Sequence, residues 1–360
     1  MLCGKGARED ALAGLITRAC CSGMAALVGG VLALVLPHTR AAAQSHPWID
    51  PGLLAAARAE GSVTVYTSTN EQEGLPLFKL FEDATGIKVQ YVRGSDTALF
   101  SRMTIEFRAG QPSFDIIHNS TAQKLPPQML AQFDPGEAKH ILPEARDPNR
   151  RWYGVYAIYN VPAYNTRMVK VSELPATYEE FLQRKHWAGK VAIDGTDNEW
   201  LKGLFAHYGE QRGAQLVKDM VATLRPVVTD GHLALARAVG AGEYWVSLNN
   251  YVNLSLNMKL AGSPIEIFAL DPVALYFSQV GVAARAPHPN AARLAANFML
   301  SQESQQFYTR FGRLPTRGDV QDNPPGTIAL LRKRKVVTVS LSADDDRAWQ
   351  RTFEGLFRPR

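Results

Sequence analysis

Cysteine is scarce in this chain of 360 residues, and its three cysteines, Cys3, Cys20 and Cys21, all lie close to the N-terminus. We predict below that this end is removed, which would leave a chain without thiols, disulfides or cysteine-bound metal. The absence argues against enzymes that use a cysteine nucleophile and against thiolate zinc sites. We expect no cofactor.

Residues 1–43 have the layout of a secretory signal peptide. Three basic residues precede an apolar run from Met24 to Leu36, and three alanines then end at Ala43, as at a small-residue cleavage site. The apolar run is about half the length of a membrane-spanning helix. We therefore expect cleavage at Ala43, export and a periplasmic location, with retention of the segment as a membrane anchor as the alternative.

A strong excess of charge of one sign is also lacking. The formal net charge is +5, and the predicted signal peptide holds four basic and two acidic residues, so about +3 is left. Basic residues are scattered, except for the run from Arg332 to Lys335, which we interpret as a solvated face. Nucleic acid is therefore not an expected partner.

Motifs of common enzyme sites are absent as well. The chain contains no HExxH, GxSxG, P-loop or GxGxxG pattern, so the chemistries that depend on those motifs are not indicated. The histidines after residue 43 are dispersed, and we interpret them as surface or loop residues. We expect a protein that is not an enzyme, with an enzyme on the same scaffold as the least favoured alternative.

The most informative segment that is present runs from Ser62 to Gly94. A β-rich run at 63–66 stops at the polar turn 67–70, an amphipathic helix follows, and a second β-rich run comes after Gly86. This is a βαβ unit with hydroxyl groups where the first strand ends. In open α/β sheets ligands bind beyond the carboxyl ends of the strands, where helix N-termini present unpaired N–H groups.

Strand-like and helix-like patterns alternate along the chain, which predicts an α/β fold. About 317 residues remain after cleavage, which is more than one hydrophobic core usually accommodates, so two lobes are expected. The expected helices lie near 53–60, 74–84, 96–109, 177–184, 199–207, 213–224, 233–240, 291–300 and 302–311, and strands are expected at 114–118 and 190–193.

Several motifs resemble one known family. They are VYTSTNEQEG, FKLFEDATGIKVQYV, FRAGQPSFDII, YAIYNVPAYNT, WAGKVAIDGTDNEWL, GEYWVSLNNYV and GVAARAPHPNAARLAANFMLSQESQQF. Together they resemble the periplasmic solute-binding proteins of ABC importers, specifically the ferric-iron-type group. The resemblance covers nearly all of the chain after the predicted signal peptide.

The resemblance implies a type II bilobal fold with two discontinuous lobes. Lobe 1 would comprise 47–155 and 281–360, and lobe 2 would comprise 160–277. The chain would cross between the lobes at 154–166 and 265–284, forming a two-strand hinge that closes around a ligand. The implied function is to capture a solute between the lobes and deliver it to an ABC permease in the inner membrane. The protein is expected to be a monomer.

Candidate ligand-binding residues gather where predicted strands end. Short polar side chains that follow strands are also common helix caps and turn residues, which is the alternative for each of them. Acidic residues in a first helical turn are favoured without any function, and aromatic residues can belong to the core. The candidates are Ser68, Thr69, Asn70, Ser95, Asp96, Ser120 and Thr121 in lobe 1, and Asp194, Thr196, Trp200, Asn249 and Tyr251 in lobe 2.

Direct iron binding can be judged on the motif positions. The resemblance implies that ferric-binding members carry two adjacent tyrosines, a histidine just after the first strand and a glutamate at the end of the FDII-type strand. This chain has Tyr251 followed by Val252, with Asn70 at the place of the histidine. Ser120 lies near the place of the glutamate. A cation as hard as Fe³⁺ prefers several oxygen or imidazole donors, and one tyrosine with amides and hydroxyls is a poor set, so direct coordination of ferric ion is disfavoured. Tyr251 is the candidate metal ligand if iron is bound.

We therefore expect a small polar or anionic organic solute, held by hydrogen bonds. Acidic residues in the predicted cleft leave an amine or a zwitterion open. Direct binding of ferric ion for iron uptake is the first alternative. A sensory protein that presents its ligand to a receptor is the second, because the sequence of a binding component does not distinguish a receptor from a permease.

Overall fold

The computed structural model describes residues 46–111 and 113–358. The predicted signal peptide at 1–43 lies outside the described residues. None of the helices in the described part is long and apolar enough to cross a membrane.

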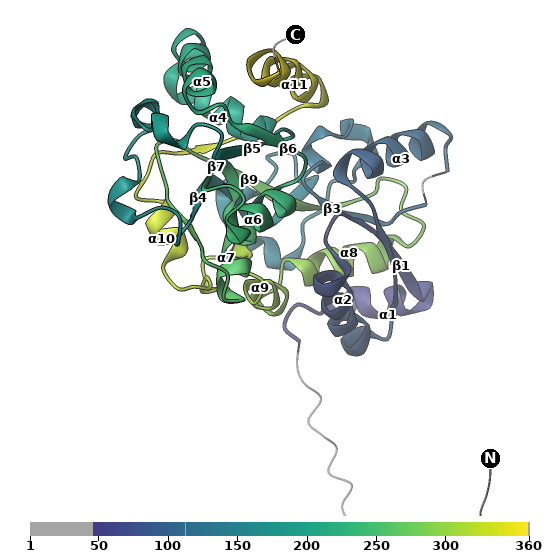
Figure 1. Cartoon of the computed structure of the whole chain (residues 1–360). Coiled ribbons are helices and arrows are strands. Elements are labelled where there is room, and N and C mark those ends of the chain that lie inside the picture. The colour runs from purple at the N-terminus through teal and green to yellow at the C-terminus, as the bar shows by residue number, and fades with distance from the viewer. Residues whose placement is uncertain (1–45, 112, 359–360) are drawn as a thin grey trace, which may run out of the picture. The chain divides into compact units, whose positions relative to one another are not determined.

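The described chain is built on a mixed β-sheet with the strand order β2-β1-β3-β9-β4-β7-β5-β6 (Figure 1). β1 pairs in parallel with β2 and β3, and β5 pairs in parallel with β6 and β7, whereas β4 and β9 are antiparallel to their neighbours in this order. The strands are β1 (Ser62–Thr67), β2 (Lys88–Arg93), β3 (Ile116–Asn119), β4 (Trp152–Asn165), β5 (Val191–Asp194), β6 (Val227–Thr229), β7 (Val246–Tyr251), β8 (Ile265–Ile267), β9 (Val273–Val282), β10 (Leu314–Pro315) and β11 (Val336–Thr338).

Helices cover the sheet, and local sequence explains where they begin and end. For example, the Asn70 side chain accepts a hydrogen bond from the Glu73 amide at the start of α2, and Gly86 ends that helix with a φ of 77°, a left-handed angle that suits glycine. The α-helices are α1 (Pro51–Glu60), α2 (Glu71–Thr85), α3 (Asp96–Arg108), α4 (Asn198–Tyr208), α5 (Glu210–Leu224), α6 (His232–Ala241), α7 (Val252–Leu260), α8 (Pro289–Met299), α9 (Gln302–Thr309), α10 (Thr327–Leu331) and α11 (Ala343–Phe357).

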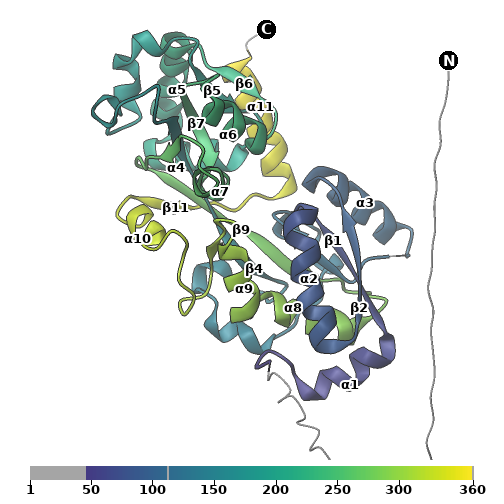
Figure 2. The same ribbon diagram turned by 60° about the horizontal axis from the view of Figure 1, so that its bottom comes forward.

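The chain has two large hydrophobic cores, and β4 and β9 extend between the elements around them (Figure 2). We call the elements around β1, β2, β3, α1, α2, α3, α8 and α9 lobe 1, and those around β5, β6, α4, α5 and α6 lobe 2. β4 pairs with β9 over Trp152–Asn160 and with β7 over Asn160–Tyr164. The predicted fold class is confirmed: the protein is α/β, with two discontinuous lobes joined by two strands. The exact residue boundaries stay a prediction.

The C-terminal helix differs from the sequence-based assignment of 281–360 to lobe 1. α11 packs against α4 and α5, and Phe353, Leu356 and Phe357 belong to the core of lobe 2. The predicted lobe is therefore wrong for this helix. Apolar residues on one helix face do not indicate which core they join, and the path of the chain after β11 decides this.

One predicted helix is also shorter than expected. The segment 177–184 contains a 3₁₀-helix at Glu179–Gln183 rather than an α-helix, and Phe181 is its one buried residue. A single buried side chain provides no apolar stripe to stabilise a longer helix.

Candidate functional site

A cavity of about 770 Å³ lies between the two lobes. Lobe 1 contributes the start of α3 and the loop after β3, whereas lobe 2 contributes the start of α4, the end of β7 and the first turn of α11. The lining residues are Ser95, Asp96, Thr97, Phe100, Ser101, Ser120, Thr121, Lys124, Thr196, Glu199, Asp230, Tyr251, Tyr276, Ala343, Asp346 and Arg347.

Six of the twelve predicted ligand-binding residues line this cavity. They lie up to 156 residues apart in the sequence. The fold brings them together because they follow the ends of strands that meet at one edge of the sheet. The six are Ser95, Asp96, Ser120, Thr121, Thr196 and Tyr251. Contact of any of them with a ligand stays a prediction.

The lobe 1 wall of the cavity is a hydrogen-bonded set of hydroxyl and carboxylate groups. The Ser95 hydroxyl caps α3 by accepting from the Ala98 amide at 3.2 Å. The Asp96 carboxylate accepts from the Ser120 hydroxyl and, at 3.4 Å, from the Ser120 amide. The second Asp96 oxygen is buried without a hydrogen-bond partner among the described atoms, so it is available to a donor in the cavity.

The polar turn 67–70, which contains the predicted residues Ser68, Thr69 and Asn70, does not line the cavity in this structure. The Thr69 side chain is buried and lies 3.4 Å from Nδ1 of His118. Asn70 caps α2 and also donates to the Glu73 carboxylate at 2.6 Å. Ser68, half-buried, lies between Thr67 and Thr69. The capping alternative therefore accounts for the Asn70 side chain.

Buried residues of neighbouring elements support the turn 67–70 by hydrogen bonds and an ion pair. Glu73 forms an ion pair with Arg313, with an Nε to carboxylate distance of 3.0 Å, and the Tyr91 hydroxyl donates to the Thr69 carbonyl at 2.5 Å. His118 is fully buried on β3, which corrects the interpretation of the histidines as surface or loop residues. Burial, with a smaller effect of Arg313, lowers the pKa of His118 to about 3, so its ring is neutral.

In lobe 2, Asp194 and Asn249 are buried and organise the loop between β5 and α4. One Asp194 oxygen accepts from the Thr196 amide at 2.9 Å, and the other accepts from the Gly231 amide at 2.6 Å. Asn249 accepts from the Asp194 amide at 2.8 Å. The Trp200 ring is in the core, where its Nε1 donates to the Tyr178 hydroxyl at 3.0 Å. These contacts give each side chain a structural role away from the cavity.

Tyr251 lies at the end of β7 with aromatic rings on two sides. Its ring stacks on His232 at a centroid distance of 3.6 Å and meets Tyr276 edge-on at 5.8 Å. Burial is the main reason that the pKa of His232 falls to about 4. Burial also raises the pKa of both tyrosines well above the ordinary value, aided by the Asp197 and Glu199 charges. At neutral pH both phenols therefore carry their protons.

The sequence-based selection did not include the other ten lining residues, among them Tyr276 and Lys124. Tyr276 lies within the predicted hinge crossing, and its face on β9 was not foreseen. Its hydroxyl is buried near that of Tyr251 and makes no hydrogen bond of standard geometry among the described atoms. Lys124 lies 3.2 Å from carboxylate oxygens of both Glu199 and Asp346. The position of Lys124 four residues after Ser120 was the available signal, whereas nothing in the sequence brings Asp346 close to Lys124.

The described residues provide a weak donor set for a metal ion. No group of three or more His, Cys, Asp or Glu residues in this part of the chain is placed to hold one. Val252, where a second adjacent tyrosine would be, is fully buried in the first turn of α7. Tyr276 nevertheless supplies a second phenol beside Tyr251, from a different strand.

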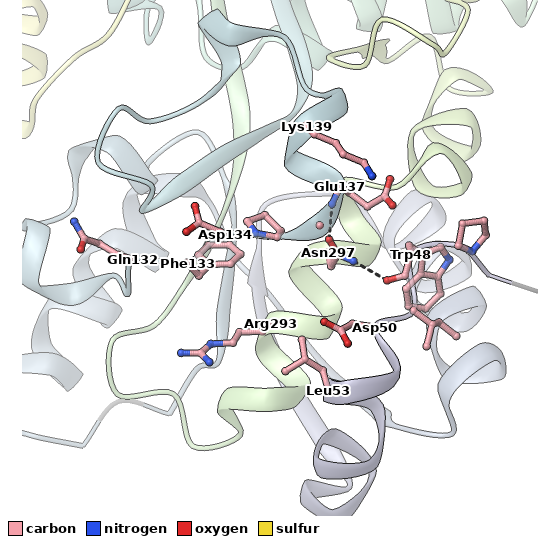
Figure 3. Close-up of a pocket in the computed structure, with 14 residues that line it drawn as sticks. Trp48, Asp50, Leu53, Gln132, Phe133, Asp134, Glu137, Lys139, Arg293 and Asn297 are labelled. Carbon is pink, nitrogen blue, oxygen red and sulfur yellow. Dashed lines mark hydrogen bonds between the residues drawn. The ribbon is translucent and has the colours of Figure 1, made fainter.

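A second cavity, of about 440 Å³, lies in lobe 1 between the start of α1, the segment 132–139 and α8 (Figure 3). Asn297 bridges its walls, because it donates to the Trp48 carbonyl at 2.6 Å and accepts from the Glu137 amide at 2.9 Å. Arg293 and Asp50 also line it. None of the predicted ligand-binding residues lies there, so the cavity between the lobes is the candidate site.

A polar cavity between two lobes that are joined by two strands defines a solute-binding protein of the kind that closes around its ligand. Residues 77–330 match the model of the family described as bacterial extracellular solute-binding protein. The chain therefore belongs to this family, whose members bind small molecules and deliver them to ABC permeases.

Relatives of similar sequence are named for different solutes. The chain is 26% identical over 265 residues to "Iron uptake protein A1" of Synechocystis sp., covering 68% of this chain and 72% of the relative. It is 27% identical over 338 residues to a "Putative 2-aminoethylphosphonate-binding periplasmic protein" of Salmonella typhimurium, covering 83% of this chain and 95% of the relative.

Solved structures show the same fold. The periplasmic binding protein AfuA from Actinobacillus pleuropneumoniae, with fructose-6-phosphate bound, superposes with a TM-score of 0.70 at 18% identity over 83% of this chain and 99% of its own. Iron-bound HitA from Pseudomonas aeruginosa gives a TM-score of 0.66 at 21% identity over 81% of this chain and 99% of its own. The predicted resemblance to the ferric-iron-type group of periplasmic binding proteins is confirmed.

Proposed function

We propose that this chain is a periplasmic binding component, not an enzyme, that works as a monomer and carries a small organic solute with an oxyanion to an ABC permease. The periplasmic location, the monomer and the solute class are parts of the proposal. The observation that carries it is the chemistry of the cavity between the lobes. It offers hydroxyl groups from both lobes, two phenols and a lysine ammonium around a single space.

The size of the cavity suits a metabolite. Its volume of about 770 Å³ falls within the roughly 300–1,000 Å³ that small-molecule sites span. The Ser95 hydroxyl, the two phenols and the Lys124 ammonium line the cavity with hydrogens that they can donate to an oxyanion, and bonds with one charged partner are the stronger kind. A phosphonate, phosphate or carboxylate group therefore has several donors within reach of one another.

The names of two relatives support this class of solute. 2-Aminoethylphosphonate and fructose-6-phosphate, which two relatives are named or described with, both carry a phosphorus oxyanion on a small organic body. The cavity also contains the acidic side chains of Asp96, Glu199, Asp230 and Asp346. These carboxylates can pair with an amine on the same solute, so a zwitterion falls within the proposal.

Ferric ion is the second candidate, and Tyr276 is the observation that favours it. Two phenols from Tyr251 and Tyr276 face one cavity, and other relatives are named for iron. Both phenols are protonated at neutral pH, because burial raises each pKa well above the ordinary value. A ferric ion would have to displace both protons, which makes this donor set less favourable than paired phenolates.

Native mass spectrometry with elemental analysis, on protein purified from the periplasm without refolding, tests the proposal first. An adduct of small organic mass is expected, followed by saturable calorimetric binding of 2-aminoethylphosphonate or fructose-6-phosphate. Ser95→Ala, which removes a hydroxyl whose hydrogen is free, should weaken that binding by about fivefold, the worth of roughly 1 kcal/mol for one hydrogen bond. Ser68→Ala is the matched control and should bind like wild type.

One iron atom per chain, lost in Tyr251→Phe, would contradict the organic solute and support the ferric alternative. Equal losses in Ser68→Ala and Ser95→Ala would show that the polar turn 67–70 also contacts the ligand.

A further inference from the structure

Lys124 is a cation supplied by the protein itself at the acidic end of the cavity. Its ammonium lies 3.2 Å from Oε1 of Glu199 and 3.2 Å from Oδ1 of Asp346. The three residues come from three separate places in the fold, namely the 3₁₀ turn Ala122–Lys124 after β3, the first turn of α4 and the first turn of α11. The contact therefore joins lobe 1 to lobe 2 across the cavity.

Lys124 and Glu199 are largely shielded from water, whereas Asp346 is partly exposed. The side chains of Lys124 and Glu199 are 11% and 7% exposed, and that of Asp346 is 35% exposed. Burial pulls the pKa of Lys124 down, but the two carboxylates more than compensate and hold it above the ordinary value. Burial is also the main reason that the pKa of Glu199 is raised, although Lys124 opposes the shift. Lys124 is therefore charged, and its charge favours the ionised form of Glu199.

The ammonium has one donor more than the two carboxylates use. A lysine ammonium carries three N–H groups, so one is left for a ligand in the cavity that Lys124 lines. A second, independent feature of the same cavity points to a ligand. Tyr276 is 2% exposed, and its hydroxyl makes no hydrogen bond of standard geometry among the described atoms.

We propose that Lys124 sets the charge selectivity of the cavity: it occupies the place of a ligand cation on Glu199 and Asp346 and offers its remaining N–H to a ligand oxyanion. This inference rests on the proposed function, because it names what the solute must carry. With Lys124 in place, an oxyanion suffices for binding. Without it, Glu199 and Asp346 are left unpaired and favour a ligand that brings its own ammonium.

A matched pair of probes tests this selectivity. Ethylphosphonate and 2-aminoethylphosphonate differ by one amino group, and calorimetry gives the ratio of their Kd values. Wild type should bind ethylphosphonate at least as tightly as 2-aminoethylphosphonate. Lys124→Met should shift the ratio by tenfold or more toward 2-aminoethylphosphonate. Lys124→Arg, which keeps the charge, should retain the wild-type ratio, and an unchanged ratio in Lys124→Met would overturn the proposal.

A second probe needs no oxyanion and separates this inference from the proposed function. n-Propylammonium should raise the thermal midpoint of Lys124→Met but not that of wild type, and the added change Glu199→Gln should abolish the effect. If neither phosphonate binds wild type but n-propylammonium behaves in this way, the solute class is wrong and the role of Lys124 stands. If n-propylammonium acts equally on all variants, the role of Lys124 is wrong.

A variant that keeps Lys124 covers the case in which Lys124→Met does not fold. Glu199→Gln removes one negative charge beside the ammonium and leaves the lysine with Asp346. Binding of ethylphosphonate should then be threefold or more tighter than in wild type. Weaker binding of ethylphosphonate by correctly folded Glu199→Gln would overturn the proposal.

Discussion

Replacing Tyr276 with phenylalanine should make the protein more stable and weaken its binding of ligand. Tyr276 is 2% exposed, and its hydroxyl makes no hydrogen bond of standard geometry among the described atoms, although the residue lines the cavity between the lobes. A buried hydroxyl without a partner costs roughly 1–3 kcal/mol of stability. Tyr276→Phe removes that cost and keeps the ring that packs against Tyr251.

The two effects have magnitudes that separate them. We expect the ligand-free variant to gain about 1 kcal/mol in free energy of unfolding, or about 2 °C in Tm for a chain of this size. Ligand should bind about fivefold more weakly, because a net hydrogen bond of roughly 1 kcal/mol is lost. Urea unfolding without ligand measures the first effect, and calorimetry with the native ligand or ethylphosphonate measures the second.

Tyr308→Phe is the matched control for this experiment. Tyr308 is also almost fully buried, and its hydroxyl also has no partner among the described atoms, but it packs beside Tyr156 in lobe 1 and does not line the cavity. It should gain similar stability with unchanged affinity. If Tyr276→Phe destabilises the ligand-free protein by more than 1 kcal/mol, or binds ligand as wild type does, the reasoning about its hydroxyl is refuted.

Three further predictions concern the support of the candidate site. His118 has a pKa of about 3 when folded against an ordinary value of 6.5, so the unfolded chain binds the extra proton as pH falls below about 6.5. Stability from this residue should be complete above pH 6.5 and about 2 kcal/mol lower at pH 5, and urea unfolding of His118→Gln should show a correspondingly flatter pH dependence. Arg313→Met leaves the buried Glu73 carboxylate unpaired and should cost roughly 3–5 kcal/mol; the double variant with Glu73→Gln should recover a large part of this, and no recovery would contradict the ion-pair argument. Asn70→Ala removes the cap of α2 and should cost about 1 kcal/mol with unchanged affinity for ligand, whereas a tenfold loss of affinity would mean that Asn70 contacts the solute.

The sequence predicted the candidate site in part because it shows where strands end. Ser95, Ser120 and Thr196 each follow a β-rich run, and the carboxyl ends of parallel strands meet at one edge of a sheet. The same reasoning also selected Asp194 and Asn249. They satisfy backbone groups of the loop after β5 instead, because a polar residue after a strand serves a turn or a ligand equally well until neighbouring elements are known.

Local order along the chain was determined by the sequence alone. The alternation of strand and helix patterns, the capped start of α2 at Asn70 and the family resemblance depend on residues that are close in sequence, and such patterns are local by nature. The same holds for the hydroxyl groups at strand ends. These features were sufficient to predict an α/β protein with two lobes that binds a solute.

Only the tertiary structure decided which side chains share the cavity. It places α11 on lobe 2, so that Asp346 meets Lys124, and it sets the face of β9 on which Tyr276 lies beside Tyr251. These contacts join residues separated by 222 and 25 positions. The stabilisation of these contacts comes from the burial and the charges of side chains on different elements. No local pattern in the sequence specifies which elements will meet.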